Sequence, residues 1–473
     1  MMFQGFLLAV LPVATSAQTV LGVYIFSRHG DRTAKAPGST HLTNLGYQEI
    51  FNSGTYFRNR YIASDASLKI ANISNDLVKL SQLSVSAPLD NVLMPSATGF
   101  LQGLYPPVGD TVSSVELHNG TNVTAPLGGY QIIPIAQAAS GTNSEDQAWL
   151  QGASNCQNAI LSSNDYFVSD EYMTLLSSTQ AFYLGLSPMV NKTFSNDQLS
   201  FKNAYTIFDL LNVANIDNVT FPSQDQLTSD TLFQLRTLAD NHEFNLAYNS
   251  SEPVRAIAGA TLAAQIVQGL NTTIVSNGST KLTIQFGAYG SFQSFFGLAN
   301  LTQANEDFYG IPDYASTMVF ELYTDVSVSS FPSTEDLRVR FLFHNGTTNS
   351  TSEPTAYPLF GSNSQNLSWA DFTSGMGKFS IGNQNDWCSA CGNTTGVCSS
   401  SILSSSSNGG NSSSTLSTNS NGSGNGLSPA ANGVIGAMVT LAVILGLEML
   451  ALLLGGYRIV SKKRLASNTA SKS

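Results

Sequence analysis

The sequence predicts an α/β protein with a doubly wound, mainly parallel sheet and an inserted helical cap. Short apolar runs rich in β-branched and aromatic residues, such as residues 20–26, are typical of strands buried on both faces of a parallel sheet. These runs alternate along the chain with segments of helical periodicity, which is the element order of doubly wound sheets. A mostly helical block at about residues 150–250 interrupts the alternation and indicates the cap.

The individual elements follow from the same patterns. A strand is predicted where apolar residues form a continuous run, and a helix where they recur every three or four positions. The predicted strands are residues 20–27, 85–93, 281–286 and 316–323, and the predicted helices are residues 47–61, 96–104, 174–186, 229–248, 255–270 and 291–298.

The composition provides apolar material for a large core but few charges for the surface. Of 473 residues, 42% are hydrophobic and only 11% are charged, well below the roughly 25% charged residues of an average soluble domain. The net charge of -11 excludes nucleic acid as a partner, because binding its phosphates requires a basic surface.

Asn-x-Ser/Thr sites are unusually dense in this charge-poor chain. They predict N-linked glycans as the groups that keep the surface hydrated, and therefore passage through the secretory pathway. The asparagines of these sites are Asn72, Asn119, Asn122, Asn191, Asn218, Asn249, Asn271, Asn277, Asn300, Asn345, Asn349, Asn366, Asn393, Asn411 and Asn421.

The four cysteines favour disulfides. Cys388, Cys391 and Cys398 form a cluster, and Cys156 lies far upstream. An even number in an extracellular chain predicts two bridges, one local and one reaching back to Cys156, although three pairings are open. The alternative, a zinc site, lacks a histidine near the cluster, so we expect disulfides and no metal.

The first 17 residues have the pattern of a secretory signal peptide. An apolar run at residues 6–13 is followed by small residues that end at Ala17. We therefore expect the folded ectodomain to occupy residues 18–400.

The C-terminal segments predict attachment to a membrane. Residues 401–432 are mostly Ser, Asn and Gly, as in a flexible stalk. Residues 433–457 are largely apolar, and about 20 helical residues span the roughly 30 Å of a bilayer core. The basic tail, residues 458–473, is expected in the cytosol, which places the ectodomain outside, at the cell surface. Replacement of this segment by a GPI anchor is the alternative.

Arg28-His29-Gly30-Asp31-Arg32-Thr33 follows the first predicted strand directly. Ligands bind at the carboxyl ends of strands in open α/β sheets. Two guanidinium groups bind phosphoryl oxygens in a bidentate manner, and Gly30 allows close backbone approach. A ring nitrogen of His29 can attack phosphorus, which predicts covalent catalysis through a phosphohistidine. The alternative is a solvated turn that contains a histidine by chance.

This element, followed by Leu42-Thr43-x-x-Gly46, resembles the histidine acid phosphatase family, the second branch of the histidine phosphatase superfamily. Further landmarks occur in the family's order at residues 86–107, 255–259 and 312–323. The resemblance covers roughly residues 20–400. It implies a phosphoglycerate mutase-like α/β core with a helical cap, a phosphomonoester as ligand, and neither a metal nor an organic cofactor.

Carried over residue by residue, the resemblance makes His29 the nucleophile and Arg28 and Arg32 phosphate-binding residues. Two positions depart from the family pattern. The third phosphate-binding arginine of the family is expected where this chain has Asn91.

The second departure concerns the family's His-Asp pair, which supplies the proton donor. Tyr289 and Gly290 occupy its place. His242-Glu243 is another histidine–acid dipeptide, but it lies on a predicted helix before the wrong landmark, so we expect it to be structural.

These departures set the expected activity. Loss of a general acid lowers the rate by about 10²- to 10⁴-fold, and a pocket arginine stabilises the transition state by roughly several kcal/mol. The sequence therefore predicts a membrane-anchored extracellular glycoprotein with weak phosphomonoesterase activity. The alternative is a catalytically inactive pseudophosphatase that binds an anion or has a structural role at the cell surface.

Overall fold

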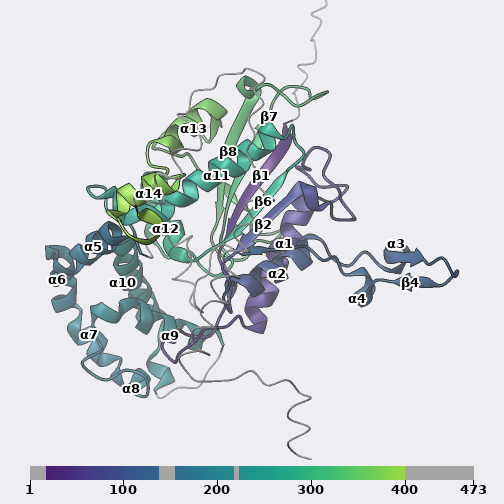
Figure 1. Ribbon diagram of the computed structural model, residues 1–473. Coiled ribbons are helices and arrows are strands. Elements are labelled where there is room, and N and C mark those ends of the chain that lie inside the picture. The colour runs from purple at the N-terminus through teal and green to yellow at the C-terminus, as the bar shows by residue number, and fades with distance from the viewer. Residues whose placement is uncertain (1–17, 138–154, 218–222, 400–473) are drawn as a thin grey trace, which may run out of the picture. The chain divides into compact units, whose positions relative to one another are not determined.

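A mixed sheet forms the centre of the part that the computed structural model describes, residues 18–137, 155–217 and 223–399 (Figure 1). The strands of this sheet are β1 (Thr19–Ser27), β2 (Leu83–Ala87), β5 (Ala136–Gln137), β6 (Leu282–Phe286), β7 (Thr317–Thr324), β8 (Leu337–His344), β9 (Thr355–Ala356) and β10 (Asn366–Ser368). Their order is β10-β8-β7-β1-β6-β2-β5, and β9 pairs with β8. A separate hairpin consists of β3 (Ser114–Glu116) and β4 (Asn122–Thr124).

The sheet divides at β1 into a parallel and an antiparallel part. On one side, β1, β6, β2 and β5 pair in parallel, as predicted. On the other side, β7 pairs antiparallel with β1, and β8 continues this pattern with β9 and β10. Strand β8 was not predicted, because its buried residues alternate with the half-buried Arg338 and Arg340.

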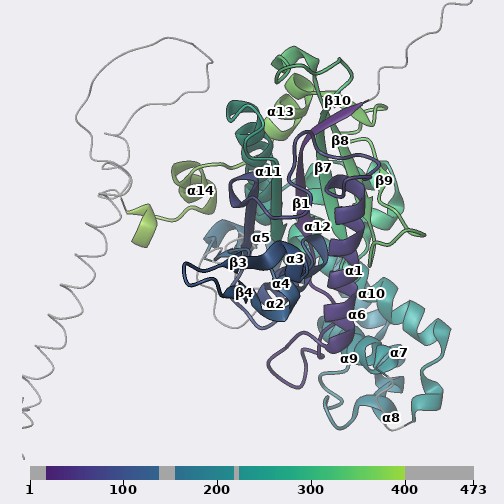
Figure 2. The same cartoon turned by 90° about the vertical axis from the view of Figure 1, so that its right-hand side faces the viewer.

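Helices cover both faces of the sheet, which gives three layers (Figures 1 and 2). Successive side chains of a strand point to opposite faces, so β1 contributes to two cores. Val23 and Ile25 pack in the core that includes α1 (Asn44–Tyr61) and α2 (Leu93–Leu104). Tyr24 and Phe26 pack on the opposite face in the core of α11 (Ile257–Val275), α12 (Tyr289–Leu298) and α13 (Trp369–Gly377).

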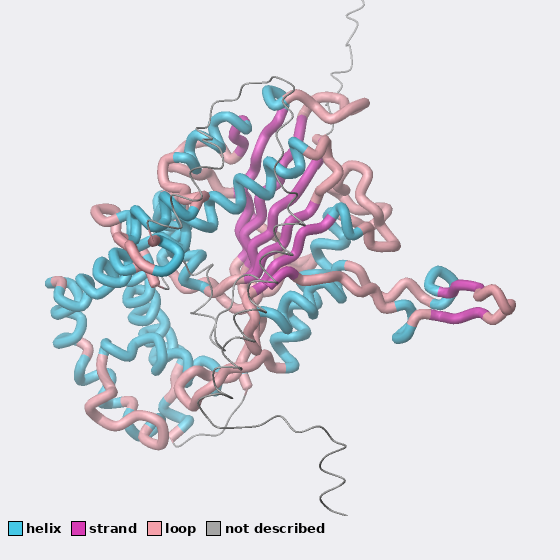
Figure 3. The backbone as a smooth tube through the Cα atoms, viewed as in Figure 1, coloured by secondary structure: helices cyan, strands magenta, loops and turns pink. Residues whose placement is uncertain are grey.

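A block of helices occupies the range in which the cap is expected, and Figure 3 shows it extending away from the sheet. Its helices are α5 (Gln157–Asp165), α6 (Asp170–Ser178), α7 (Gln180–Gly185), α8 (Ser187–Val190), α9 (Ala204–Ile216) and α10 (Ser229–Ala247). The block has its own apolar core, which includes Tyr183, Phe201 and Leu235. Two short helices, α3 (Asp110–Ser113) and α4 (Pro126–Gly129), flank the β3–β4 hairpin, and α14 (Gln384–Cys391) lies near the C-terminal end of the described residues.

Several predicted elements differ in their bounds from the observed ones, and two of these differences have a clear local cause or effect. The strand predicted at residues 85–93 is β2, which ends at Ala87, and Asp90 caps the start of α2 instead. The Asp90 Oδ1 atom accepts hydrogen bonds from the backbone N–H groups of Val92 (2.8 Å) and Leu93 (2.5 Å). The helix predicted at residues 174–186 is interrupted at Thr179, between α6 and α7.

Both expected kinds of disulfide are present. Cys388 pairs with Cys398 over 10 residues, and Cys156 pairs with Cys391 over 235 residues. The long bridge joins the start of α5 to the end of α14 within a small apolar cluster that also contains Ile257.

Removing the long bridge with Cys156→Ser and Cys391→Ser is expected to lower the free energy of unfolding by about 5 kcal/mol, because closing a long loop restricts the unfolded chain most. Chemical denaturation of the oxidised proteins measures this loss. Cys388→Ser with Cys398→Ser is the matched control and should cost less, since its loop is short. A larger loss for the control would contradict the loop-length argument.

The predicted signal peptide (1–17), stalk (401–432), transmembrane helix (433–457) and cytoplasmic tail (458–473) lie outside the described residues. Within the part of the chain that is described, no helix has both the length and the apolar character needed to cross a membrane.

Candidate functional site

The predicted motif begins where β1 ends, at Ser27. The parallel neighbour β6 ends in register with it, because Ser27 pairs with Phe286. The backbone N–H of Gly287 then donates to the Ser27 carbonyl (3.0 Å). The motif therefore occupies the carboxyl edge of the parallel strands, where α/β sheets bind ligands.

The motif loop packs backbone to backbone against the start of α1. A Cβ atom added to Gly30 would lie 2.1 Å from the Gly46 carbonyl oxygen, and one added to Gly46 would lie 2.0 Å from the Asp31 oxygen. The Thr43 side chain caps α1 by accepting from the Gly46 N–H (3.1 Å). The two glycines of the sequence motif thus serve the same close contact, which fixes the loop that carries His29.

His29 is fully buried beside this contact. Its Nδ1 atom lies 2.7 Å from the Gly30 carbonyl oxygen. A carbonyl only accepts hydrogen bonds, so Nδ1 carries the proton and Nε2 holds the lone pair of the neutral ring. The ring centroid lies 5.4 Å from that of Tyr314. The backbone also holds His29, since its carbonyl accepts from the Ala315 N–H (2.7 Å).

Arg28 lies among aromatic rings at the same edge. Its guanidinium donates through Nη1 to the Pro312 carbonyl. The guanidinium carbon is 4.7 Å from the Tyr314 ring centroid and 5.4 Å from that of Tyr289. Cation–π contacts of this kind stabilise a cation by about 0.5–2 kcal/mol and hold it in place.

Arg32 is fully buried and paired with a carboxylate from the helical block. Its Nη2 lies 3.0 Å from Asp209 Oδ1, and its Nη1 donates to Oδ2 at 3.3 Å. Nη2 also donates to the Tyr205 hydroxyl (3.0 Å). Asp209, on α9, is 3% exposed and accepts from the Lys35 backbone N–H as well (2.7 Å). The carboxylate thus engages the fork of the guanidinium that would grip a phosphate.

Tyr205 and Tyr314, which lie beside these cations, stay neutral over the physiological range. Burial raises the pKa of Tyr205 to about 12, although the positive charges of Arg32 and Lys35 oppose this shift. Burial likewise raises the pKa of Tyr314. The Lys35 Nζ atom is 5.3 Å from the Tyr205 ring centroid and 5.7 Å from that of Tyr289. Tyr205 and Tyr314 therefore carry hydroxyl groups, not phenolates, at this site.

Tyr289 is the first residue of α12, immediately after the turn that follows β6, and Gly290 is half-buried behind it. The Tyr289 hydroxyl donates to Glu243 Oε2 (2.7 Å), and Glu243 Oε1 lies 2.7 Å from His242 Nδ1. The dipeptide expected to be structural therefore contacts the position that departs from the family pattern. Only the helical His-Glu dipeptide itself signals this pairing in the sequence.

Asn91 lies next to the motif loop, with its side chain exposed. Its carbonyl accepts from the Leu42 N–H (3.2 Å), and Leu42 forms a β-bridge with Arg32. The structure thus brings Arg28, His29, Arg32, Tyr289 and the backbone of position 91 to one edge of the sheet. The helical block contributes Tyr205 and Asp209, which were not predicted from the sequence, and Glu243, which was expected to be structural.

The carboxyl groups of Glu49 and Asp31 hold the motif loop through hydrogen bonds. Glu49 Oε2 accepts from the Asp31 N–H (2.7 Å), and Asp31 Oδ2 accepts from the Thr43 hydroxyl (2.5 Å). Burial raises the pKa of Glu49 to about 7, and the charge of Asp31 adds to this rise. Burial also raises the pKa of Asp31.

Glu49 is expected to make the fold less stable as pH rises. The folded protein holds the Glu49 proton more tightly than the unfolded chain does. The contribution of this proton to the free energy of unfolding is therefore complete below about pH 4.5 and is lost as pH rises through about 7. Glu49→Gln keeps an acceptor for Asp31 and should remove this decline, on the order of 3 kcal/mol between the two limits. Urea unfolding at several pH values measures it. The exposed Glu116→Gln is the control, and an unchanged slope in Glu49→Gln would refute the assignment.

Within residues 18–137, 155–217 and 223–399, no group of three or more His, Cys, Asp or Glu side chains is placed to hold a metal ion.

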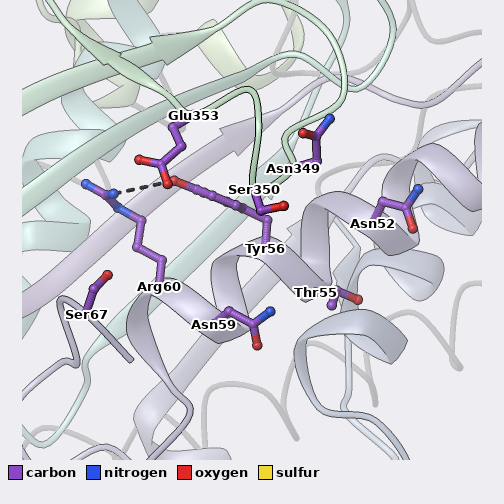
Figure 4. A pocket seen from close by; sticks show the side chains of 9 residues that line it. All are labelled: Asn52, Thr55, Tyr56, Asn59, Arg60, Ser67, Asn349, Ser350 and Glu353. Carbon is purple, nitrogen blue, oxygen red and sulfur yellow. Dashed lines mark hydrogen bonds between the residues drawn. The ribbon is translucent and has the colours of Figure 1, made fainter. Parts of the chain in front are cut away.

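A separate cavity of about 320 Å³ lies between α1 and the segment near β9 (Figure 4). Arg60 Nη1 donates to the Tyr56 hydroxyl at its wall (3.4 Å), and Arg60 also pairs with the buried Glu321 (3.0 Å). None of the residues predicted for the phosphate site lines it. The lining residues are Asn52, Thr55, Tyr56, Asn59, Arg60, Ser67, Asn349, Ser350 and Glu353.

Comparisons with solved structures agree with this architecture. The phytase of Hafnia alvei in its apo form superposes with a TM-score of 0.51 at 11% identity, covering 80% of this chain and 99% of that one. The phytase of Citrobacter braakii gives 0.52 at 13% identity, with 79% and 99% coverage. The phytase of Klebsiella sp. ASR1 gives 0.50 at 12% identity, with 77% and 95% coverage. At these identities the shared feature is the fold.

The sequence comparisons identify the family. No curated protein matches the chain. A family model described as histidine phosphatase superfamily (branch 2) matches residues 36–344. This range begins after the Arg28–Thr33 element, so the match is independent of the motif that first indicated the family. The chain belongs to branch 2 of the histidine phosphatase superfamily.

Proposed function

We propose that this protein is a phosphomonoesterase of low activity, with His29 as nucleophile and Arg28 and Arg32 as phosphate ligands. The observation that carries the proposal is the placement of His29. It is buried at the carboxyl edge of β1, and the Gly30 carbonyl fixes its Nδ1 proton. The lone pair of the neutral ring is therefore on Nε2, and two guanidinium groups lie on the same loop.

The proposed reaction follows from this geometry. The Nε2 atom forms a bond to phosphorus while the bond from phosphorus to the leaving oxygen breaks, and that oxygen takes up a proton. Water then cleaves the phosphorus–nitrogen bond, which releases phosphate and the free imidazole. Arg28 supplies positive charge for the phosphoryl oxygens in both steps.

Three features of the site lower the expected rate. Asp209 engages the fork of Arg32, so a phosphate must compete with a buried carboxylate. Asn91 brings no charge to the place of the third arginine. Tyr289 occupies the place of the family's proton donor, and an unperturbed tyrosine, with a pKa near 10, is a weak acid for this task. Each deficit acts on a different part of the transition state.

The Asp209–Arg32 pair also favours a second candidate function, that of an inactive anion-binding protein. A site with one arginine occupied can still hold an anion through Arg28 without catalysing its hydrolysis. The Hafnia alvei phytase, which shares this fold with a TM-score of 0.51, has been solved in complex with tartrate, a dianion. This supports an anion site in the fold without indicating turnover.

The proposal places the phosphatase domain on a membrane as a glycoprotein. The sequence support consists of the signal-like residues 1–17 and the apolar residues 433–457. The structure adds that none of the predicted glycan sites within the described residues is buried. The exposed asparagines are Asn72, Asn119, Asn122, Asn191, Asn271, Asn277, Asn345, Asn349 and Asn366, and the half-buried ones are Asn249, Asn300 and Asn393.

Phosphate release from an aryl phosphate tests the proposal, measured on the purified full-length protein from about pH 3 to pH 8, where carboxyl and imidazole groups titrate. We expect slow turnover that disappears in His29→Ala. The matched control is His118→Ala, on the exposed β3–β4 turn, which should retain the wild-type rate.

The opposite result separates the two candidate functions. If the wild type has no turnover but phosphate or vanadate raises its thermal stability, and Arg28→Ala removes that effect, the protein is an anion-binding pseudophosphatase. If neither turnover nor protection occurs, both functions are excluded.

A further inference from the structure

Residues 311–316 form a loop, which we call the Tyr314 loop, that immediately precedes β7 and lies against the motif. The loop binds Arg28 at two points. The Pro312 carbonyl accepts a hydrogen bond from the Arg28 guanidinium, and the Ser316 carbonyl accepts one from the Arg28 backbone N–H (2.9 Å). Because one nitrogen of the guanidinium is tied to Pro312, the direction of its other N–H groups depends on where the loop lies.

The Tyr314 loop also contacts His29. The Ala315 N–H donates to the His29 carbonyl (2.7 Å), and the Tyr314 ring centroid lies 5.4 Å from that of the His29 ring. Ala315 is fully buried, and its φ of 62° lies in the left-handed region that alanine rarely adopts. A backbone in this region persists only where its surroundings hold it. Contacts from outside the loop must therefore maintain the conformation that meets Arg28 and His29.

Two side chains from different parts of the fold hold the loop at Asp313. Asn345, directly after β8, accepts through Oδ1 from the Asp313 N–H (2.7 Å) and the Ser316 hydroxyl (3.1 Å). Its Nδ2 donates to Asp313 Oδ2 (3.2 Å). Arg236, on α10, donates through Nη1 to Asp313 Oδ1 (2.8 Å) and through Nη2 to the Ile311 carbonyl. The Asp313 carboxylate thus binds one side chain from the helical block and one from the end of the sheet.

The Asp313 carboxylate is close to water, since its side chain is 50% exposed. Ion pairs at such exposure contribute little to the free energy of unfolding. The hydrogen bonds of Asp313 therefore act mainly on the local position of the Tyr314 loop. A variant that lacks them should still fold.

We propose that Asp313 is a positioning residue for phosphoryl transfer, an inference that rests on the proposed phosphatase function. Asp313 joins Arg236 to Asn345, and the Tyr314 loop that it fixes keeps Arg28 and His29 in place for the phosphate. Asp313 acts through these two residues and contacts neither the phosphate nor the leaving group. The geometry of the site thereby depends on both the helical block and the sheet.

Hydrolysis of 4-nitrophenyl phosphate by the full-length protein tests this role. Asp313→Ala should lower kcat/KM by about 10- to 100-fold, because misplacing a reacting group by about 1 Å costs up to roughly 100-fold. Asp313→Asn keeps an acceptor oxygen for Arg236 and should lose less. The matched control is Asp371→Ala, which removes an exposed carboxylate that accepts from the Ser368 hydroxyl (2.6 Å) at the start of α13. This variant should retain the wild-type rate.

A double-mutant cycle with Arg28 separates positioning from a general loss of structure. If Asp313 acts through Arg28, adding Asp313→Ala to Arg28→Ala should cost clearly less than it costs in the wild type. A change that merely loosens the fold would lower the rate by the same factor in both backgrounds. Equal factors would therefore overturn the inference.

Asn345 requires a control of its own, because it is also a predicted glycan site. Asn345→Ala removes both the amide and the glycan, whereas Thr347→Ala removes the Asn-x-Thr site and keeps the amide. Asn345→Ala should reproduce the loss seen in Asp313→Ala, and Thr347→Ala should retain the wild-type rate. An equal loss in both variants would mean that the glycan supports the loop, and would overturn the role of the hydrogen bonds to Asp313.

Phosphate protection against heat distinguishes failure of this inference from failure of the proposed function. Inorganic phosphate should raise the Tm of Asp313→Ala less than that of the wild type. Unchanged turnover and equal protection in Asp313→Ala would overturn the inference while the proposed function stands. Protection of the wild type without turnover, weakened in Asp313→Ala, would overturn the phosphatase function and keep Asp313 as a positioning residue of an anion site. A wild type with neither turnover nor protection would overturn both.

Discussion

Restoring the two missing groups of the family is expected to raise kcat/KM for an alkyl phosphate such as glycerol 2-phosphate, whose alkoxide leaving group needs a proton, by about 10²- to 10⁴-fold, the range that a general acid contributes. The variant combines Tyr289→His, Gly290→Asp and Asn91→Arg. The scaffold for these groups is already in place, because α12 starts at Tyr289 beside the motif loop and the backbone of Asn91 binds Leu42 in that loop.

Local structure favours each replacement. An acidic side chain at position 290 lies in the first turn of α12, where the helix dipole stabilises negative charge by roughly 0.3–1 kcal/mol. The side chain of Asn91 is exposed, so replacing it with arginine disrupts no buried contact. Its guanidinium adds charge next to the loop that carries Arg28, and removal of one such group from a site typically costs about 3 kcal/mol of transition-state stabilisation.

Steady-state kinetics of the triple variant measure the gain, with the variant Asn91→Arg alone as the control for added charge. Adding His29→Ala to the triple variant must abolish the gain if the new groups act on the proposed nucleophile. A gain that survives His29→Ala, or a triple variant no faster than wild type, would show that the departures from the family pattern do not limit the rate.

The local part of this site could be predicted from the sequence because local rules produce it. The apolar run of β1 leads straight into Arg28, and the glycines of the motif are required by one backbone contact. Strands buried on both faces are read from composition alone, which is why β1, β6 and β7 were predicted within two residues of their observed bounds. The presence of one local and one long disulfide followed from the cysteine spacing, whereas the choice of Cys391 as the partner of Cys156 did not.

The rest depended on contacts between distant residues. Asp209 meets Arg32 across 177 positions, and Glu243 meets Tyr289 across 46, with no periodicity that links them. The alternation of β8 was missed because half-buried Arg338 and Arg340 break its apolar run, and Arg340 becomes acceptable only through its pairing with the buried Glu321. Partners of this kind follow from packing, which a single sequence does not encode locally.

The pairing of Asp209 with Arg32 leads to the second large expected effect. Asp209→Ala should lower the free energy of unfolding by about 3–5 kcal/mol, because it leaves the fully buried Arg32 guanidinium without its carboxylate. Asp209→Asn keeps the volume and an acceptor oxygen, so its loss should be smaller. Thermal unfolding in phosphate-free buffer measures both losses.

Phosphate should reverse this loss, and the reversal tests the site itself. A ligand that binds only the folded state stabilises it by RT ln(1 + [L]/Kd), so a tighter Kd gives a larger shift at the same concentration. If Asp209 competes with phosphate for the Arg32 fork, inorganic phosphate must raise the Tm of Asp209→Ala and Asp209→Asn more than that of the wild type.

The control for this experiment is Asp240→Ala, which removes another carboxylate of the helical block, one that pairs with Arg236 at 2.9 Å. Asp240 is 22% exposed and its partner is more exposed than Arg32, so the loss of stability should be smaller and phosphate should not restore it. Equal phosphate shifts in wild type, Asp209→Asn and Asp240→Ala would mean that Arg32 is a structural residue. The proposed low activity would then have to arise from Tyr289 and Asn91 alone, because the carboxylate of Asp209 would be competing with no ligand.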